Sequence, residues 1–163
     1  MARRFRGEFV QKLDEKGRVS IPAAFRRVIE AGDPDWPEAK QSNFVLVYGD
    51  ERRNFFECYT IEGADAIDER IEQLDEDSPE RRDLEEFFNG FSLLMSVDDS
   101  GRVVIPERQR EKIGLQGEAY FIAYGSTFQI WRKEDYEARN RPADTLDKEV
   151  DPLRRLPKKR LDG

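Results

Sequence analysis

The sequence predicts an α+β fold in which two related ββαββ halves flank a helical linker. Three observations predict it: an internal repeat at a constant offset of 84 residues, period-2 alternation of apolar residues after each copy, and apolar residues spaced three and four apart between the copies. We expect the first half over residues 7–62, the linker over 63–90, the second half over 91–136 and a solvated C-terminal tail over 137–163.

The repeat is a tight turn followed by a short strand. Asp accepts backbone N–H bonds in such turns, and Gly adopts a positive φ at no steric cost. The strand after the turn alternates, so Val19 and Ile21 should face inward while Arg18 faces outward, with Arg102 in the matching place of the second copy. The predicted turn residues are Asp14 and Gly17 in the first copy and Asp98 and Gly101 in the second.

The other elements follow in the same order in each half. Pro22 is compatible with the first turn of a helix, and the charged loop at 49–54 separates two apolar segments. In the first half we therefore expect a strand over 8–13, a helix over 23–30 and strands over 44–48 and 55–60. Related segments at 120–125 and 128–131 predict the last two strands of the second half, so that Val19, Ile21, Val103 and Ile105 share one apolar interior about a pseudo-twofold axis.

The linker has the spacing of two amphipathic helices. One is expected over 62–74, and Ser78 as N-cap with Pro79 at the first helical position begins another. The predicted apolar stripes are Ala64, Ile67, Ile71 and Leu74 in the first helix, and Leu84, Phe87 and Phe88 in the second.

Composition excludes several classes of site. The chain has no histidine and one cysteine, which excludes Ser-His-Asp and Cys-His catalysis, zinc fingers and a disulfide within the chain. We expect Cys58 to be a small core residue, and we expect no metal, no cofactor and no small-molecule substrate. No apolar segment approaches the roughly 18 residues that span a bilayer, so we expect a cytoplasmic protein without a membrane partner.

Charge is segregated along the chain. The net charge of −7 divides into +4 over residues 1–30, −14 over 31–100 and +3 over 101–163. Salt screens charges beyond about 10 Å, so a local basic face governs docking at contact distance. The acidic middle segment is therefore compatible with DNA binding by the two copies of the repeat.

The geometry of the turn requires its Asp and Gly residues, but it does not require the arginine that follows them. Arg presents a planar fork of donors that matches phosphate oxygens or the O6 and N7 atoms of guanine. We therefore expect Arg18 and Arg102 to contact DNA, with Lys16 as a phosphate contact and Arg4 and Arg6 as further basic contacts. The carboxylate pairs beside each turn could serve acid–base or Mg²⁺ chemistry, but Asp is favoured in turns on structural grounds and no nucleophile accompanies them. We expect no enzyme activity.

Several motifs occur together in this chain: the paired Asp-x-x-Gly-Arg turns, Ile21-Pro22 and Ile105-Pro106, Phe5-Arg6-Gly7, Pro79-Glu80-Arg81-Arg82 and Phe128-Gln129-Ile130-Trp131. With these motifs, residues 5–140 resemble the MraZ family of bacterial transcriptional regulators, which belongs to the AbrB-like swapped-hairpin group. The resemblance implies two tandem SpoVT-AbrB-type half-domains with a β-barrel-like core, and a ring-like homo-oligomer that binds direct repeats in double-stranded DNA at the promoter of the division and cell-wall gene cluster. It also implies that Arg18 and Arg102 contact the DNA. The second copy departs from the first by having Ser100 in the place of Lys16, and the loop at 32–42 is longer. The resemblance also implies that the protein is associated with the nucleoid.

One alternative function stays open at this point. The acidic linker helices could serve as the surface of an oligomeric protein-interaction module that does not bind DNA. A salt titration separates the two, because neutralised phosphates make DNA affinity fall steeply with salt.

Overall fold

The computed structural model describes residues 3–139 and 151–158, and it confirms the α+β class with two ββαββ halves. The first half contains β1 (Glu8–Lys12), β2 (Arg18–Ser20), α1 (Ala23–Ala31), β3 (Asn43–Val47) and β4 (Phe56–Thr60). The second contains β5 (Ser92–Ser96), β6 (Arg102–Val104), α4 (Glu107–Ile113), β7 (Glu118–Tyr124) and β8 (Thr127–Arg132).

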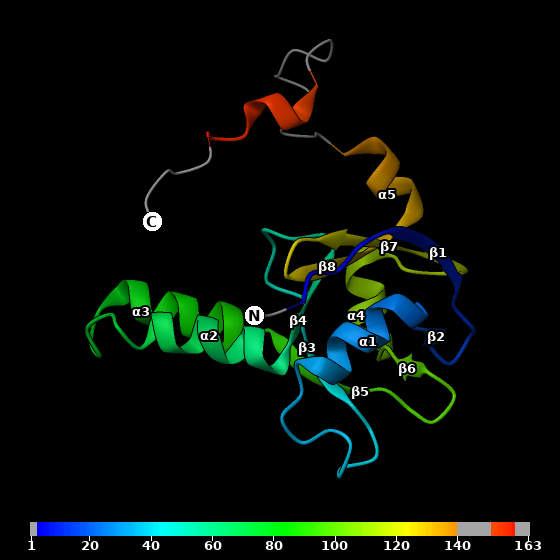
Figure 1. Cartoon of the computed structure of the whole chain (residues 1–163), viewed down its shortest axis with the longest axis horizontal. Coiled ribbons are helices and arrows are strands. Elements are labelled where there is room, and N and C mark those ends of the chain that lie inside the picture. Colours follow the sequence, from blue (N-terminus) through cyan, green and yellow to red (C-terminus); the bar gives the residue numbers. More distant parts are fainter. Residues whose placement is uncertain (1–2, 140–150, 159–163) are drawn as a thin grey trace.

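Strands of the two halves interleave in one antiparallel sheet of six strands, in the order β1-β7-β8-β4-β3-β5 (Figure 1). The equivalent strands of the two halves are β1 and β5, β3 and β7, and β4 and β8. Each pair lies at equal distances from the centre of the sheet, which is the pattern of a pseudo-twofold axis between β8 and β4. The first strand of each half pairs with the third strand of the other half, as in the pairing of Phe9 with Phe121. The six-stranded sheet itself is not closed, and β1 and β5 form its edges.

A two-stranded ribbon of β2 and β6 forms the second sheet. Val19 pairs with Val103 at its centre, Arg18 pairs with Val104, and Ser20 pairs with Arg102. A bridge between Leu13 and Val19 links the ribbon to the end of β1.

The ribbon and the sheet share one hydrophobic core. Val19, Ile21, Val103 and Ile105 are all buried in it, which confirms the predicted inward face. Phe128 lies at the centre of its aromatic side chains, with ring centroids 5.0 Å from Phe5, 4.9 Å from Phe25, 5.7 Å from Phe44 and 6.0 Å from Phe121.

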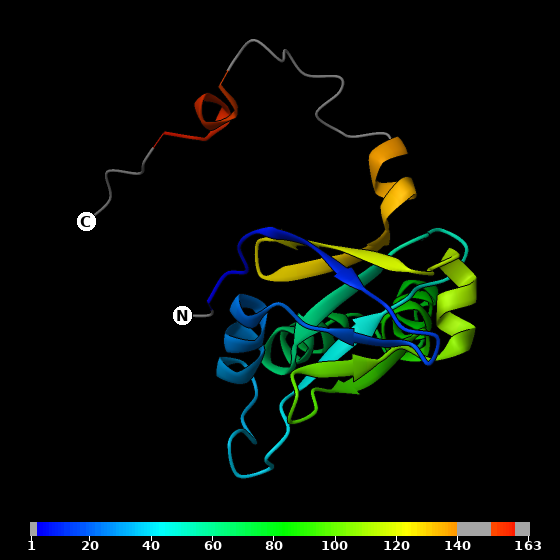
Figure 2. The ribbon, with the colours of Figure 1, turned by 90° about the vertical axis from the view of Figure 1, so that its right-hand side faces the viewer.

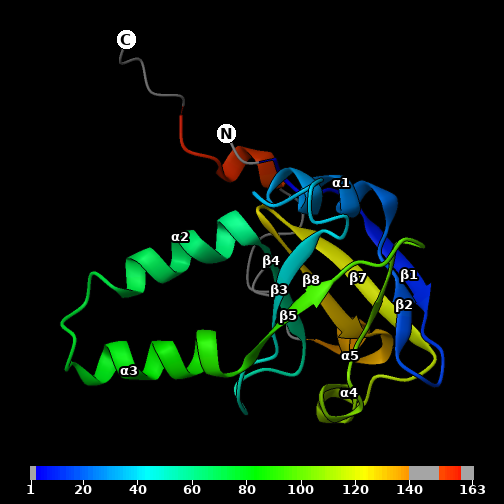
Figure 3. The ribbon, with the colours of Figure 1, turned by 90° about the horizontal axis from the view of Figure 1, so that it is seen from below.

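The linker forms a helical pair that projects from the sheet, on the side away from the ribbon (Figures 1 and 3). It consists of α2 (Ile61–Ile71), α3 (Pro79–Glu85) and the π-helical turn η1 (Glu86–Gly90). Ser78 is the predicted N-cap, since its Oγ accepts a bond from the backbone N of Arg81 at 3.2 Å. A small second cluster holds the pair to the body through Val47, Ala64, Ile71 and Phe88.

Two predicted stripe residues lie outside this packing. Leu74 is 37% exposed because α2 ends at Ile71, and Leu84 is 41% exposed because α3 passes into a π-helical turn. A π-helical turn changes the phase between Leu84 and the phenylalanines after it. The apolar contacts of the second helix are therefore made by Phe87 and Phe88.

The chain after β8 was expected to become a solvated tail at residue 137. Helix α5 (Lys133–Ala138) includes its first two residues, and the Tyr136 ring stacks on Tyr120 at 4.1 Å. The exposed segment 151–158 contains a short 3-10 helix, η3 (Pro152–Arg155), whereas 140–150 and 159–163 lie outside the described residues. Within the described ranges, no helix is both long and apolar enough to cross a membrane.

Candidate nucleic-acid interface

Turn 1, residues 14–17, is organised by the carboxylate of Asp14. Its Oδ1 accepts bonds from the backbone N of Lys16 at 3.0 Å and of Arg18 at 2.8 Å, and its backbone oxygen accepts one from Gly17 at 3.0 Å. Gly17 has a φ of +86°, in the left-handed region that favours glycine. The predicted turn residues therefore act together to set the direction of Arg18.

Turn 2, residues 98–101, repeats this geometry. Asp98 Oδ1 accepts bonds from the backbone N of Ser100 and of Arg102, both at 2.9 Å, and Gly101 has a φ of +77°. The two turns therefore present their arginines in the same way, which is the structural counterpart of the sequence repeat.

The aspartates of the turns remain ionised. The pKa of Asp14 is lowered chiefly by the backbone N–H of Arg18 and then by the Arg18 side chain. The pKa of Asp98 is lowered chiefly by the backbone N–H of Arg102, and the positive charge of Arg18 contributes as well. A general base at neutral pH needs a pKa near 7, so these carboxylates are suited to holding turns and poorly suited to proton transfer.

The outward face of the ribbon consists of Arg18, Ser20, Arg102 and Val104, which alternate with the buried valines. Turn 1 and turn 2 stand at opposite ends of this ribbon (Figure 2). Because Arg102 pairs with Ser20, it is the diagonal neighbour of Arg18, about 7–8 Å away between side-chain stems. A two-stranded ribbon fits the major groove of B-DNA, so both guanidiniums could enter one groove together.

The two arginines differ in their immediate contacts. Arg18 Nε donates to Asp14 Oδ2 at 2.6 Å, and its side chain is 41% exposed. Arg102 Nε is buried without a hydrogen-bond partner among the described residues. Lys16 is exposed in turn 1, where turn 2 has Ser100.

Arg4 and Arg6 lie elsewhere. Both are exposed, and the backbone N of Phe5 between them donates to the oxygen of Gly125 in the β7–β8 turn at 2.9 Å. This places them at the opposite end of β1 from turn 1. The structure brings Arg18, Arg102 and Lys16 to the ribbon but leaves Arg4 and Arg6 apart from it.

Three further residues belong to this region and were not assigned a role from the sequence. Val104 is 54% exposed between the arginines, and the alternation that predicted Arg18 to face outward could have identified it. Arg26 and Arg110 lie beside the turns, and both occur eight positions after the arginine of a turn. Their matching register in the repeat was the signal that could have revealed them.

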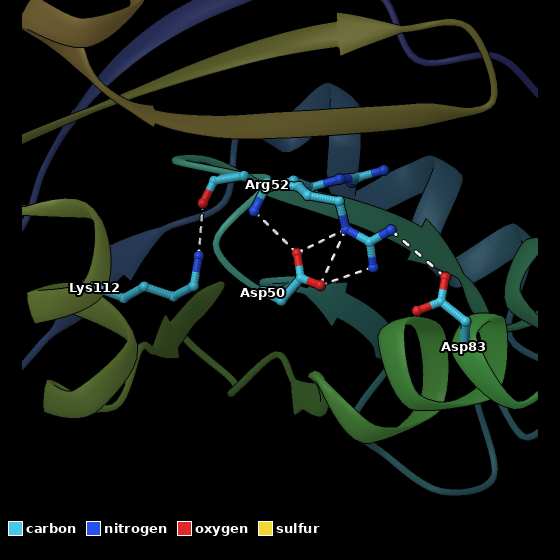
Figure 4. Close-up of polar contacts among 5 residues, drawn as sticks. Asp50, Arg52, Asp83 and Lys112 are labelled. Atoms are coloured by element: carbon cyan, nitrogen blue, oxygen red, sulfur yellow. Dashed lines mark hydrogen bonds and ion pairs between the residues drawn. The ribbon is translucent and has the colours of Figure 1, made fainter.

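A second polar cluster joins the β3–β4 loop to α3 and α4 (Figure 4). Arg52 lies 2.7 Å from Asp50 and 3.5 Å from Asp83, while Lys112 Nζ donates to the backbone oxygen of Arg53 at 2.6 Å. The hydrogen bond from the Arg52 side chain lowers the pKa of Asp50 to about 2. The ion pairs of Arg52 link the β3–β4 loop to α3, and the hydrogen bond of Lys112 links the same loop to α4. In the described part of the chain no group of His, Cys, Asp and Glu residues is placed to hold a metal ion.

The similarity of this chain to known proteins covers much more of its length than the two turn motifs. A family model described as "MraZ protein, putative antitoxin-like" matches residues 93–149. A protein named "Transcriptional regulator MraZ" from Ruegeria pomeroyi is 50% identical over 161 residues, which cover 96% of each chain. A protein of the same name from Cereibacter sphaeroides is 49% identical over 145 residues, which cover 85% of each chain. Another, from Rickettsia akari, is 30% identical over 142 residues, which cover 87% of this chain and 90% of the relative.

The match to the Ruegeria pomeroyi protein covers 96% of this chain, so it spans both halves and the linker. The chain belongs to the MraZ family.

Proposed function

We propose that this protein is a sequence-specific DNA-binding transcriptional regulator and that the outward face of the β2–β6 ribbon enters the major groove. The observation that carries the proposal is the diagonal placement of Arg18 and Arg102 on one exposed ribbon face, each after an Asp-Gly turn of the same geometry. The names of the relatives, transcriptional regulators at up to 50% identity over most of the chain, support the same function.

Recognition in this proposal divides between the groups of the face. Arg18 and Arg102 supply forks for guanine or phosphate, Val104 supplies apolar contact for a thymine methyl group, and Lys16 supplies a phosphate contact. The carboxylates of Asp14 and Asp98 are turned onto backbone N–H groups, which reduces their repulsion of the phosphates.

The test is a binding assay with the DNA duplex upstream of this protein's own gene and a scrambled duplex of the same composition. Arg18→Ala and Arg102→Ala should each weaken binding by about 10-fold or more, while Lys16→Ala should reduce the slope of log affinity against log salt by about 1. Arg82→Ala is the matched control, because Arg82 is exposed on α3 and pairs with the exposed Asp77 at 3.7 Å. Equal affinity for both duplexes, or equal effects of Arg18→Ala and Arg82→Ala, would refute the proposal.

The finer part of the proposal concerns the target and the assembly. We propose that several chains form a ring that reads short direct repeats at the promoter of the division and cell-wall gene cluster. Major-groove faces recur about every 10 base pairs, and linked sites multiply affinity without new contacts. Inserting about five base pairs between repeats should therefore cost much more affinity than inserting about ten. Equal affinity for a single repeat and for both spacings would show that the subunits bind independently.

The alternative is a protein-interaction module whose surface is the acidic α2–α3 pair, which projects from the body (Figure 3). Its binding partner would be a protein, and affinity for the upstream duplex would be absent at every salt concentration. The salt titration described above therefore separates the two functions.

A further inference from the structure

Each turn of the ribbon is packed against an arginine from the helix of the other half. Arg110, in the first helical turn of α4, donates from Nε to the backbone oxygen of Ile105 at 2.8 Å and from Nη1 to that of Glu15 at 3.4 Å. A Cβ atom on Gly17 would lie 2.7 Å from Arg110 Nε, closer than side chains approach. The guanidinium of the second half therefore fills the space directly beside turn 1.

Arg26 takes the matching place at turn 2 by packing, and its Nε is buried without a hydrogen-bond partner among the described residues. It lies in the first helical turn of α1, and a Cβ on Gly101 would collide with its Nη1 and lie 2.8 Å from its Cζ. Arg26 and the turn residues Asp98 and Asp99 line one hollow of about 250 Å³. Turn 2, in the second half, is thus packed against a side chain of the first half.

The antiparallel pairing of the ribbon explains why each turn contacts an arginine of the other half. The two ends of the ribbon are closed by bonds from Ile105 N to Gly17 O at 2.8 Å and from Ile21 N to Gly101 O at 2.9 Å. Because each isoleucine lies directly before the proline that begins a helix, the helix of one half starts beside the turn of the other half.

We propose that Arg110 and Arg26 are positioning residues, and that each holds the DNA-binding turn of the other half in its binding conformation. The inference rests on the proposed function of the ribbon. Arg110 is half-buried, and its guanidinium donates to Glu15 of turn 1 and to Ile105, whose backbone N donates to Gly17 of the same turn. It therefore acts through Arg18 rather than on the DNA. A planar group with several donors can bond two carbonyls at fixed angles, which a lysine cannot reproduce.

Arg110→Lys in the full-length protein tests this role, because lysine keeps the charge and loses the fork. Melting followed by circular dichroism first establishes that the variant is folded at the assay temperature. Hydrogen exchange should then accelerate in the backbone of turn 1 and remain as in the wild type in turn 2, with the reverse for Arg26→Lys. This measurement needs no DNA, so it remains informative if the proposed function fails.

Binding to the upstream duplex gives the second measurement. Arg110→Lys should weaken binding about 10-fold with an unchanged salt slope, whereas Arg110→Met would lower the slope by about 0.9 if Arg110 touched a phosphate directly. Combined with Arg18→Ala the substitution Arg110→Lys should have little further effect, and combined with Arg102→Ala it should retain its full effect of about 10-fold, because residues that act through one group are not additive.

Three results would overturn the inference: unfolding of Arg110→Lys, a salt slope that falls in Arg110→Met by the amount expected for a phosphate contact, or full additivity of Arg110→Lys with Arg18→Ala. If the wild type does not prefer the upstream duplex, the proposed function fails, and hydrogen exchange alone decides whether each arginine holds the turn of the other half.

Discussion

Alanine at the two turn glycines should destabilise the protein unequally, although the turns have the same backbone conformation. Gly17 and Gly101 both have φ in the left-handed region, at +86° and +77°. This conformation costs an alanine about 1 kcal/mol relative to glycine. The difference between the sites comes from what the new methyl group meets.

At Gly17 the methyl group would collide with the backbone oxygen of Ile105, which cannot move without disturbing the ribbon. That oxygen also accepts the bond from Arg110 Nε at 2.8 Å. A hydrogen bond to a charged group contributes about 2 kcal/mol, so Gly17→Ala should cost about 3 kcal/mol in total. At Gly101 the methyl group meets only side-chain atoms of Arg26 and no backbone atom. Arg26 can turn aside at the expense of its packing against turn 2, so the cost should stay at about 1 kcal/mol.

Thermal unfolding of the full-length protein distinguishes these values. For a chain of this size about 1 kcal/mol corresponds to a shift of about 2–4 °C, so we expect a decrease of about 6–12 °C for Gly17→Ala and about 2–4 °C for Gly101→Ala. Equal shifts, or a larger one at Gly101, would refute the argument from the Ile105 oxygen.

Three further predictions concern the core and the titratable groups. Phe128→Ala removes a fully buried ring from the centre of the aromatic cluster and should cost about 3–5 kcal/mol in urea unfolding; a cost below about 1 kcal/mol would mean that the cluster can repack. The Cys58 thiol is buried, which raises its pKa, so a thiol reagent at about pH 8 should react only after unfolding, and rapid reaction of the native protein would contradict its placement. Asp50 has a pKa of about 2 in the folded protein, below its usual 3.8, so its contribution to stability should be complete above about pH 4 and be lost as the pH falls toward 2. The stability difference between the wild type and Asp50→Asn should shrink over that interval, and a difference independent of pH would exclude the Arg52 pair as its source.

The sequence predicted structure best at positions where local backbone geometry alone determines which residue type fits. The Asp-Gly pairs predicted both turns, and alternation predicted that Val19 and Val103 would be buried, because each depends on local backbone geometry. Strand order depends on long-range pairing, and a period of two does not specify a partner. The pairing of β1 with β7 was therefore not predictable from the residues of either strand.

The candidate site was predicted in part for the same reason. Arg18 and Arg102 follow turns that the sequence specifies, so the residues around them determine their side of the ribbon. Arg4 and Arg6 were selected on charge alone, and charge does not specify where a segment lies; the bond from Phe5 to Gly125 places them beside another turn. The packing of Arg110 against turn 1 also required the fold, because 93 residues separate it from Gly17.

The interleaved halves separate the most acidic segment of this chain, whose net charge is −7, from the ribbon. Residues 61–90 contain twelve of the 35 acidic side chains and only three basic ones, and they form the helical pair on the far side of the sheet from the ribbon (Figures 1 and 3). A helix such as α2, with 11 residues, extends about 16 Å, which is longer than the screening distance of about 8 Å at physiological salt. The potential near the outward face is therefore set by the ribbon and its turns. There Asp14 and Asp98 are bonded to backbone N–H groups, Asp14 also pairs with the Arg18 guanidinium, and Arg18 and Arg102 are diagonal neighbours. The acidic linker stays away from the ribbon because it joins the end of β4 to the start of β5, which are both strands of the six-stranded sheet, whereas the two turns lead into β2 and β6.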